Sequence, residues 1–380
     1  MVGMETKRGI LVVSLDFELY WGVRDLCSID EYAEKWGGER ERIAEILDLF
    51  RDRGIHATWA TVGLLFFAGK EEMLQGLPAL KPAYSDSRLS PYGHIAGGGV
   101  GQGEDDDPHH FALSLIERIR STPGQRIGSH TFSHYYSLEK GQTERQFYSD
   151  LQAAADVAAK RGIPLESLVL PRNQIRRKYV GRLAELGIKT YRGNPQHRLY
   201  RDGYSASDPP LKRALRLADS YFNLTGHHTY PAESLAPKAP LSLPASFFFR
   251  SPPRWLGWLE PLRLYRMRRS MTHAAKHGQV YHLWFHPYNA AEEAGMRALK
   301  RLANHFRRLA ERYGMISLNM EELAEAVLAG RPAAEPLGRP AEGAGAEADA
   351  FPARAEETVS ACRTSPGPSY SANEVKLHGH

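Results

Sequence analysis

Cysteine is scarce in this sequence, because only Cys27 and Cys362 occur among its 380 residues. Two cysteines so far apart form neither the disulfide framework of a small secreted domain nor a zinc site built from cysteine pairs. Both kinds of protein are therefore excluded. The low count is typical of a protein from a reducing compartment.

Long hydrophobic runs are also lacking. The apolar run 10–13 is too short for the core of a secretory signal, and no stretch approaches the ~20 apolar residues of a membrane-spanning helix. We therefore expect a soluble protein of the cytoplasm. Its net charge of +5 suits an anionic membrane surface or another polyanion but requires neither.

Strand-like and helix-like segments alternate along most of the chain. The strand-like segments are residues 9–16, 55–63, 125–130, 166–171, 188–193, 279–286 and 315–319, and the helix-like segments are 38–54, 109–124, 143–162, 179–187, 292–314 and 320–330. Repeated strand–helix units predict a parallel sheet, and this series is long enough for an α/β barrel. Because no linker interrupts the alternation, we expect one domain over residues 8–330.

Two segments depart from this alternation. Residues 331–380 are rich in Ala, Pro, Glu and Gly, and such a segment cannot bury enough apolar surface to fold, so we expect a disordered tail. Residues 93–110 are first glycine-rich and then acidic. They lack the GK[ST] ending of a phosphate-binding loop, so we expect a surface loop, with cation binding by its Asp and His residues as the alternative.

Chemically useful side chains follow several of the predicted strands. Asp16 and Glu18 stand at the end of the first strand, His130 and His134 at the end of the third, and His286 at the end of the strand 279–286. Imidazole and carboxylate are good ligands for divalent first-row metals, and parallel barrels carry their chemistry at the carboxyl ends of the strands. Each residue alone has a structural explanation, but their joint occurrence at strand ends favours a metal site.

Four segments resemble, in order, the motifs of the polysaccharide deacetylases with a NodB-type domain, carbohydrate esterase family 4. They are "SLDFE", "HTFSH", "LPRNQ" and "LWFHP", and the resemblance covers roughly residues 8–330. It implies a distorted (β/α) barrel of about seven strands and a metal-dependent hydrolase that removes N-acyl groups. The first motif departs from the usual adjacent Asp pair, because Phe17 stands where the second Asp is expected.

The resemblance also implies a role for each motif residue. Asp16 would be the general base and His286 the general acid, while Glu18, His130 and His134 would bind one divalent metal. Zinc is expected first, with cobalt, nickel or iron as alternatives. Arg172, which follows Pro171, would orient Asp16 and tune its charge, although its order relative to the proline differs from the family pattern.

Aromatic and basic residues elsewhere in the sequence suit contact with a substrate or a membrane. Trp21, Trp284 and Tyr288 are candidates for stacking on a sugar, and Asn289 for binding its hydroxyls, with core or rim packing as the alternative. Residues 247–271 mix arginines with aromatic and aliphatic side chains. This composition suits a helix at a membrane surface, or a helix packed on the barrel with its arginines in solvent.

The sequence therefore predicts a metal-dependent amide hydrolase that removes an N-acyl group, with N-acetyl expected first, from a sugar or saccharide precursor in the synthesis of cell-surface polysaccharide. A nucleotide sugar or a lipid-linked saccharide would be the substrate, and no nucleic acid is expected as a partner. A deformylase of a lipid-linked amino sugar and an allantoinase-like amidohydrolase are alternatives. A non-catalytic carbohydrate- or lipid-binding module is the alternative from a different class, and Phe17 alone favours it.

Overall fold

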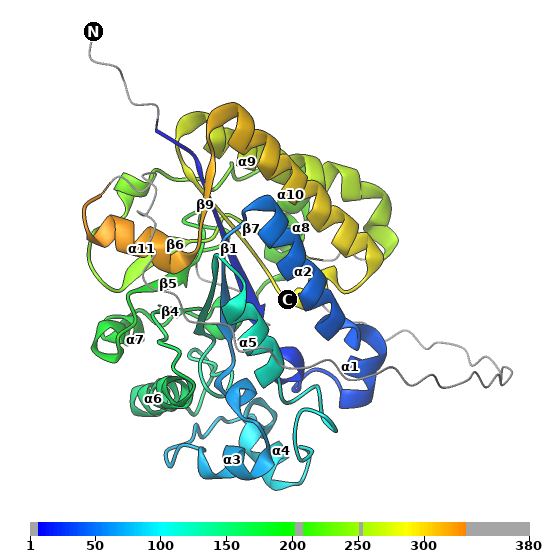
Figure 1. Cartoon of the computed structure of the whole chain (residues 1–380), viewed down its shortest axis with the longest axis vertical. Helices are drawn as coiled ribbons and strands as arrows, with labels where there is room; N and C mark the ends of the chain where they lie inside the picture. The colour runs from blue at the N-terminus through cyan, green and yellow to red at the C-terminus, as the bar shows by residue number, and fades with distance from the viewer. Residues whose placement is uncertain (1–6, 202–207, 251–253, 332–380) are drawn as a thin grey trace, which may run out of the picture. The chain divides into compact units, whose positions relative to one another are not determined.

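The computed structural model describes residues 7–201, 208–250 and 254–331 (Figure 1). The predicted disordered tail lies outside these residues, apart from Arg331. All strands join one parallel sheet, which confirms the predicted α/β class. The strands are β1 Ile10–Phe17, β2 Ala57–Thr61, β3 Gln125–Ser129, β4 Ser167–Leu168, β5 Thr190–Gly193, β6 Leu241–Pro244, β7 Phe247–Phe248, β8 Val280–Phe285 and β9 Ile316–Leu318.

The sheet closes into a barrel. Its strand order is β6-β5-β4-β3-β2-β1-β8-β7, and the two terminal strands, β6 and β7, are separated in sequence only by Ala245 and Ser246. The Ala245 N–H donates to the Gly193 carbonyl on one side, and the Ser246 N–H donates to the His282 carbonyl on the other, both at 2.8 Å. Residues 241–248 therefore act as one continuous strand of the barrel wall, or stave, between β5 and β8. The very short β4 and β7 make the barrel irregular.

The barrel wall then has seven staves, which is the predicted number, but they are not the same seven segments that the sequence predicted as strands. The prediction counted 315–319, which forms β9 and pairs only with the beginning of β1, at residues 10–12. It missed β6 and β7, because the segment "LSLPASFFF" contains Pro244 and has no clear strand period. The closing stave is thus the one part of the barrel that the sequence pattern did not indicate.

The helices surround this barrel. They are α1 Ile29–Trp36, α2 Glu39–Arg53, α3 Lys70–Gln75, α4 Pro91–Ala96, α5 Leu113–Ser121, α6 Glu144–Lys160, α7 Arg177–Val180, α8 Pro210–Phe222, α9 Glu260–His277, α10 Glu293–Tyr313 and α11 Met320–Leu328. The predicted helix 179–187 is instead the end of α7 and a short 3-10 turn, η5 Leu183–Leu186. No helix among the described residues combines the length and apolarity that spanning a bilayer requires.

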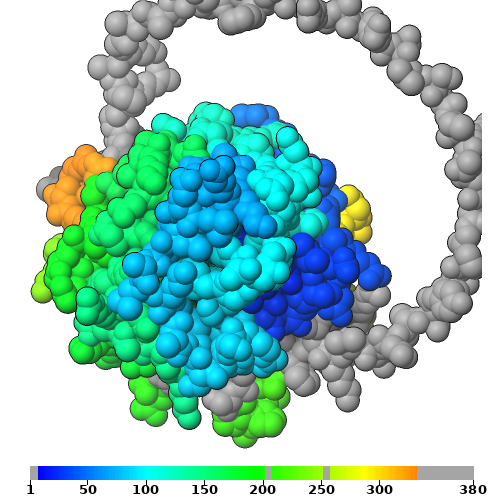
Figure 2. Space-filling view, turned by 90° about the horizontal axis from the view of Figure 1, so that it is seen from below, coloured from blue at the N-terminus to red at the C-terminus, as the bar shows by residue number. Residues whose placement is uncertain are grey.

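The alternation of side chains along β1 separates the core from the site. Leu11, Val13, Leu15 and Phe17 belong to the main apolar cluster, which also takes in residues of the surrounding helices, whereas Ser14 and Asp16 are buried polar residues on the other face of the strand. The polar side chains therefore lie inside the barrel, near the carboxyl end of β1. In Figure 1 this end points down, and Figure 2 looks at that face from below.

Much of the glycine-rich and acidic segment 93–110 lies at the surface, as predicted, but the segment also contains a helix and buried side chains. Residues 91–96 form α4, and farther on His110 is fully buried while Asp107 is 8% exposed. The Asp107 carboxylate accepts the Gly101 N–H at 2.7 Å and lies 2.8 Å from the His110 ring. The glycine amides and the acidic side chains thus satisfy one another, which packs the segment against the chain that follows β1.

Candidate metal and catalytic site

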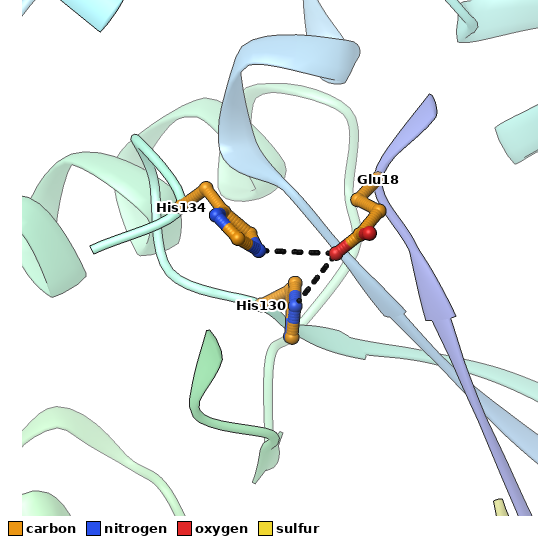
Figure 3. Close-up of side chains that lie close together, drawn as sticks. All are labelled: Glu18, His130 and His134. Carbon is orange, nitrogen blue, oxygen red and sulfur yellow. Dashed lines mark ion pairs between the residues drawn. The ribbon is translucent and has the colours of Figure 1, made fainter. Parts of the chain in front are cut away.

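Glu18, His130 and His134 meet at the carboxyl ends of β1 and β3 (Figure 3). Oε2 of Glu18 lies 3.2 Å from Nε2 of His130 and 3.0 Å from Nε2 of His134. All three side chains are buried, and within the described residues no other group of His, Cys, Asp and Glu is placed to hold a metal ion. The predicted ligand set is therefore assembled in space.

The hydrogen bonds on the far side of His130 fit a bound cation. Nδ1 of His130 lies 2.9 Å from the Val169 carbonyl, which can only accept, so Nδ1 carries a proton. In the neutral ring, Nε2 then directs its lone pair at the Glu18 carboxylate, and this buried nitrogen has no hydrogen-bond partner among the described residues. Two electron-rich atoms facing each other in a buried site favour a positive ion between them.

His134 is oriented by a hydrogen-bonded series that runs from His134 through Tyr136 to Asp25. Its Nδ1 lies 3.0 Å from the Tyr136 hydroxyl, which donates to Oδ1 of Asp25 at 3.2 Å. Burial holds the pKa of Tyr136 well above its usual range, so this hydroxyl keeps its proton. Burial also lowers the pKa of His134, which favours the neutral imidazole that binds metals. This series therefore fixes the His134 tautomer with Nε2 free toward the site.

Arg172 contacts the side chains that orient His134 and does not contact Asp16, the predicted base. Its guanidinium donates to Oδ2 of Asp25 at 2.6 Å and lies over the Tyr136 ring at 4.4 Å. The prediction that Arg172 orients Asp16 is therefore wrong. Arg172 follows the two-residue β4 in a left-handed conformation, φ 53°, from which its side chain reaches Asp25.

The two histidines are brought together by a loop and not by a helix. Thr131 and His134 have φ of 64° and 56°, a left-handed conformation that costs energy in residues other than glycine. Asp150 on α6 holds this loop, because its carboxylate accepts the N–H of Phe132 at 2.7 Å and the Ser133 hydroxyl. A buried carboxylate without a metal role is thus part of the site's framework, and the sequence pattern did not single it out.

Asp16 is paired with Arg192 of β5. Nη1 and Nη2 of Arg192 donate to the two carboxylate oxygens at 2.5 and 2.7 Å, and both side chains are buried. Arg192 also donates to the Asn173 side chain at 3.0 Å and to the Ser14 hydroxyl at 3.2 Å. Burial alone would raise the pKa of Asp16, but the Arg192 guanidinium, together with the His130 and His286 rings, outweighs burial and brings this pKa below its usual value. Asp16 is therefore ionised and held in one orientation.

His286 lies over the two carboxylates from the end of β8. Its Nε2 is 3.4 Å from Oε1 of Glu18 and 3.7 Å from Oδ2 of Asp16. The ring stacks on Tyr288 at 4.6 Å, and the His286 N–H donates to the Asn289 side chain at 2.9 Å. The His286 side chain is 15% exposed, more than Glu18 or Asp16, so it stands between them and solvent.

Three predicted substrate residues pack within the protein instead. Trp21 is buried, and its indole N–H donates to the His110 carbonyl. Trp284 is held between the Arg192 guanidinium at 4.2 Å and the stacked Phe248 ring at 4.1 Å. Asn289 is buried and caps the loop that carries His286. Tyr288, which is half-buried beside His286, stays a predicted substrate contact.

Gly22 should be essential for the position of Glu18. A Cβ atom at residue 22 would lie 2.1 Å from Oε1 of Glu18, so Gly22→Ala must displace this carboxylate from its present position beside the histidines. We expect metal affinity to fall about tenfold or more, as for changes that misplace a metal ligand. Isothermal titration of the metal-free protein with Zn²⁺ measures this.

Gly38→Ala is the matched control, because a Cβ there meets nothing within 4 Å and the residue has an ordinary φ of −80°. Unchanged affinity in Gly22→Ala would contradict the placement of Glu18 as a ligand.

Solved structures with similar folds are known. A candidate polysaccharide deacetylase from Mycobacterium smegmatis aligns with a TM-score of 0.53 at 13% identity, covering 87% of this chain and 93% of that one. The allantoinase Puue aligns with a TM-score of 0.52 at 12% identity, with the same two coverages. No protein-family model and no curated protein matches the sequence. At such low identity the likeness concerns the fold, and the chain therefore has the barrel fold of these two proteins, as its motifs predicted.

Proposed function

We propose that this protein is a metal-dependent amide hydrolase that removes an N-acyl group, N-acetyl in the first instance, from a sugar or a saccharide precursor. The observation that carries the proposal is the meeting of three kinds of group. The buried Glu18, His130 and His134 lie beside an ionised Asp16, with His286 within 4 Å of both carboxylates. The cytoplasmic location and the role in polysaccharide synthesis stay predictions.

Amide hydrolysis requires an activated water, stabilisation of the carbonyl oxygen and a proton for the departing nitrogen. Glu18, His130 and His134 would hold a divalent cation, which would supply a Lewis acid for the carbonyl and make a water molecule more acidic. Asp16 is ionised and fixed by Arg192, so it can accept the proton of the water that attacks the acyl carbon.

His286 lies on the more exposed side of the carboxylates, where its Nε2 can deliver a proton to the amide nitrogen as the carbon–nitrogen bond breaks. The products are then a carboxylate and a free amine. Stacking on Tyr288 orients this ring, and the bond from the His286 backbone N–H to the Asn289 side chain holds the loop that carries it.

An allantoinase-like activity on a small cyclic amide is the second candidate, because the Puue barrel aligns about as well as the deacetylase barrel. A deformylase would use the same groups on a smaller acyl group. A binding module without catalysis is less well supported, since the residues needed for hydrolysis lie together.

Mass spectrometry of purified protein incubated with N-acetylated and N-formylated nucleotide sugars, lipid-linked saccharides and allantoin tests the proposal. We expect loss of an acyl group from a sugar, about one divalent metal per chain, and loss of both metal and activity in His130→Ala or His134→Ala. His277→Ala, an exposed histidine at the end of α9, is the matched control. Ring opening of allantoin would select the second candidate. Absence of metal, together with activity that a chelator leaves unchanged, would rule out the metal mechanism.

A further inference from the structure

Helix α8 turns its apolar side to solvent. Leu211, Leu215 and Phe222 are 71%, 42% and 59% exposed, and their spacing of four and seven residues puts them on one stripe of the helix, together with Ala214 and Ala218. A surface helix of a globular protein normally packs this stripe against the core. The orientation of α8 is therefore the reverse of the usual one.

Polar contacts hold α8 in this orientation. Arg216, which is buried, donates to the Asp208 carboxylate at 2.6 Å. Asp219 is fully buried, and its carboxylate lies 3.1 Å from the Arg266 guanidinium of α9. The buried residues of α8 are thus Arg216, Asp219 and Tyr221, and the apolar stripe takes no part in this buried side.

The neighbouring segment extends this apolar surface. Trp258, in the 3-10 turn η7 Arg254–Leu259, is 76% exposed, and Tyr265 on α9 is 55% exposed. Figure 1 shows α8 and α9 in the same part of the molecule, and the Asp219–Arg266 pair joins them. Six of the nine large apolar side chains that are exposed in the described residues belong to α8, η7, α9 and the residues that follow α8: Leu211, Leu215, Phe222, Leu224, Trp258 and Tyr265. We call this set the α8–α9 surface.

The exposed charges around the α8–α9 surface are basic. Arg213, Arg268 and Arg269 are exposed. The acidic side chains of the same helices face inward, since Asp219 is buried and Glu260, 17% exposed, binds Arg263. Arg263 and Arg266 are buried as well, so only part of the basic character that residues 247–271 show in the sequence reaches the surface.

We propose that the α8–α9 surface binds the surface of an anionic lipid bilayer. Exposed aliphatic and aromatic side chains on a helix lying flat enter the interface, and arginines beside them attract acidic headgroups. Charge complementarity favours a lipid surface over a second copy of this chain, because two copies meeting face to face would bring their arginines together. The proposal stands on this surface alone and does not depend on the reaction proposed above.

Co-sedimentation of the full-length protein with vesicles tests the proposal. We expect binding to phosphatidylcholine vesicles that contain phosphatidylglycerol, weaker binding at high salt, and little binding to phosphatidylcholine alone. The triple variant Leu211→Ser, Leu215→Ser, Leu224→Ser should lower the partition coefficient about tenfold or more. Arg268→Glu with Arg269→Glu should lower it to a similar extent.

The matched control is Leu26→Ser, Leu74→Ser, Leu138→Ser, which changes three exposed leucines outside the α8–α9 surface and should bind as the unchanged protein does. Circular dichroism verifies that each variant is folded. Equal recovery in the supernatant with and without anionic vesicles would overturn the proposal. So would a dimer in light scattering that the first triple variant dissociates, because a second copy would then cover the surface.

Discussion

Asp16→Asn is expected to lower kcat/KM about a thousandfold while leaving about one metal ion per chain, because asparagine cannot accept the proton of the attacking water. The amide is close to the carboxylate in size and can still accept a hydrogen bond from Arg192, so the ring of ligands beside it should keep its shape. Metal analysis and kinetics on the same preparation give both quantities.

Glu18→Gln is the matched change at the neighbouring carboxylate, and its expected result is the opposite order of effects. It removes the negative charge that faces His130 and His134 at 3.2 and 3.0 Å, so metal should be lost first and activity with it. Restoring activity with excess Zn²⁺ in Glu18→Gln but not in Asp16→Asn would separate a ligand from a base. If Asp16→Asn loses the metal and Glu18→Gln retains it, the two roles are reversed.

Arg192→Gln is expected to destabilise the protein by about 3 kcal/mol at neutral pH, since breaking a buried ion pair leaves the other charge without a partner. With Arg192 present, the folded-state pKa of Asp16 lies below its unfolded value. The pair therefore contributes stability above the unfolded pKa, and this stability is lost as pH falls through the folded pKa. Without the guanidinium, burial raises the pKa of Asp16, so the variant should instead lose stability as pH rises through that raised value.

The same variant should move the acid limb of the kcat/KM profile to higher pH, because Asp16 acts as a base only when ionised. Thermal unfolding at several pH values and the pH–rate profile check the two parts. Arg161→Gln is the matched control, since Arg161 binds the partly exposed Glu72 and its loss should cost less than about 1 kcal/mol. An acid limb that stays in place in Arg192→Gln would show that Asp16 does not set it.

Much of the fold could be predicted because most strands are continuous apolar runs and most long helices have an amphipathic pattern. Residues 280–285 form a continuous apolar run in the sequence and are a strand in the structure. Residues 293–313 have an amphipathic pattern and form a long helix. The stave 241–248 could not be predicted in this way. It is held by backbone bonds to β5 and β8, which lie on either side of it, and those bonds leave no trace in its own side-chain pattern.

The candidate site shows the same division. Asp16, Glu18, His130, His134 and His286 could be gathered from sequence, because parallel strands end at one edge and each residue follows a strand. The residue that pairs with Asp16 could not be identified in this way. Arg172 and Arg192 both lie near the ends of predicted strands, and which one faces the barrel interior depends on the register of β4 and β5. Arg192 faces inward on β5, whereas β4 is too short to give Arg172 a defined side.

The position of β1 has a consequence for when the site comes into being. This strand, near the start of the chain, pairs with β2 nearby but also with β8 and β9, so that Ile10 lies opposite both Val280 and Ile316. Contacts over such separations close late, after the intervening chain exists. Asp16 and Glu18 are therefore made among the first residues, yet they face His286 only once nearly the whole barrel has been synthesised. The full set of side chains that the proposed reaction requires therefore comes together only in the nearly finished barrel.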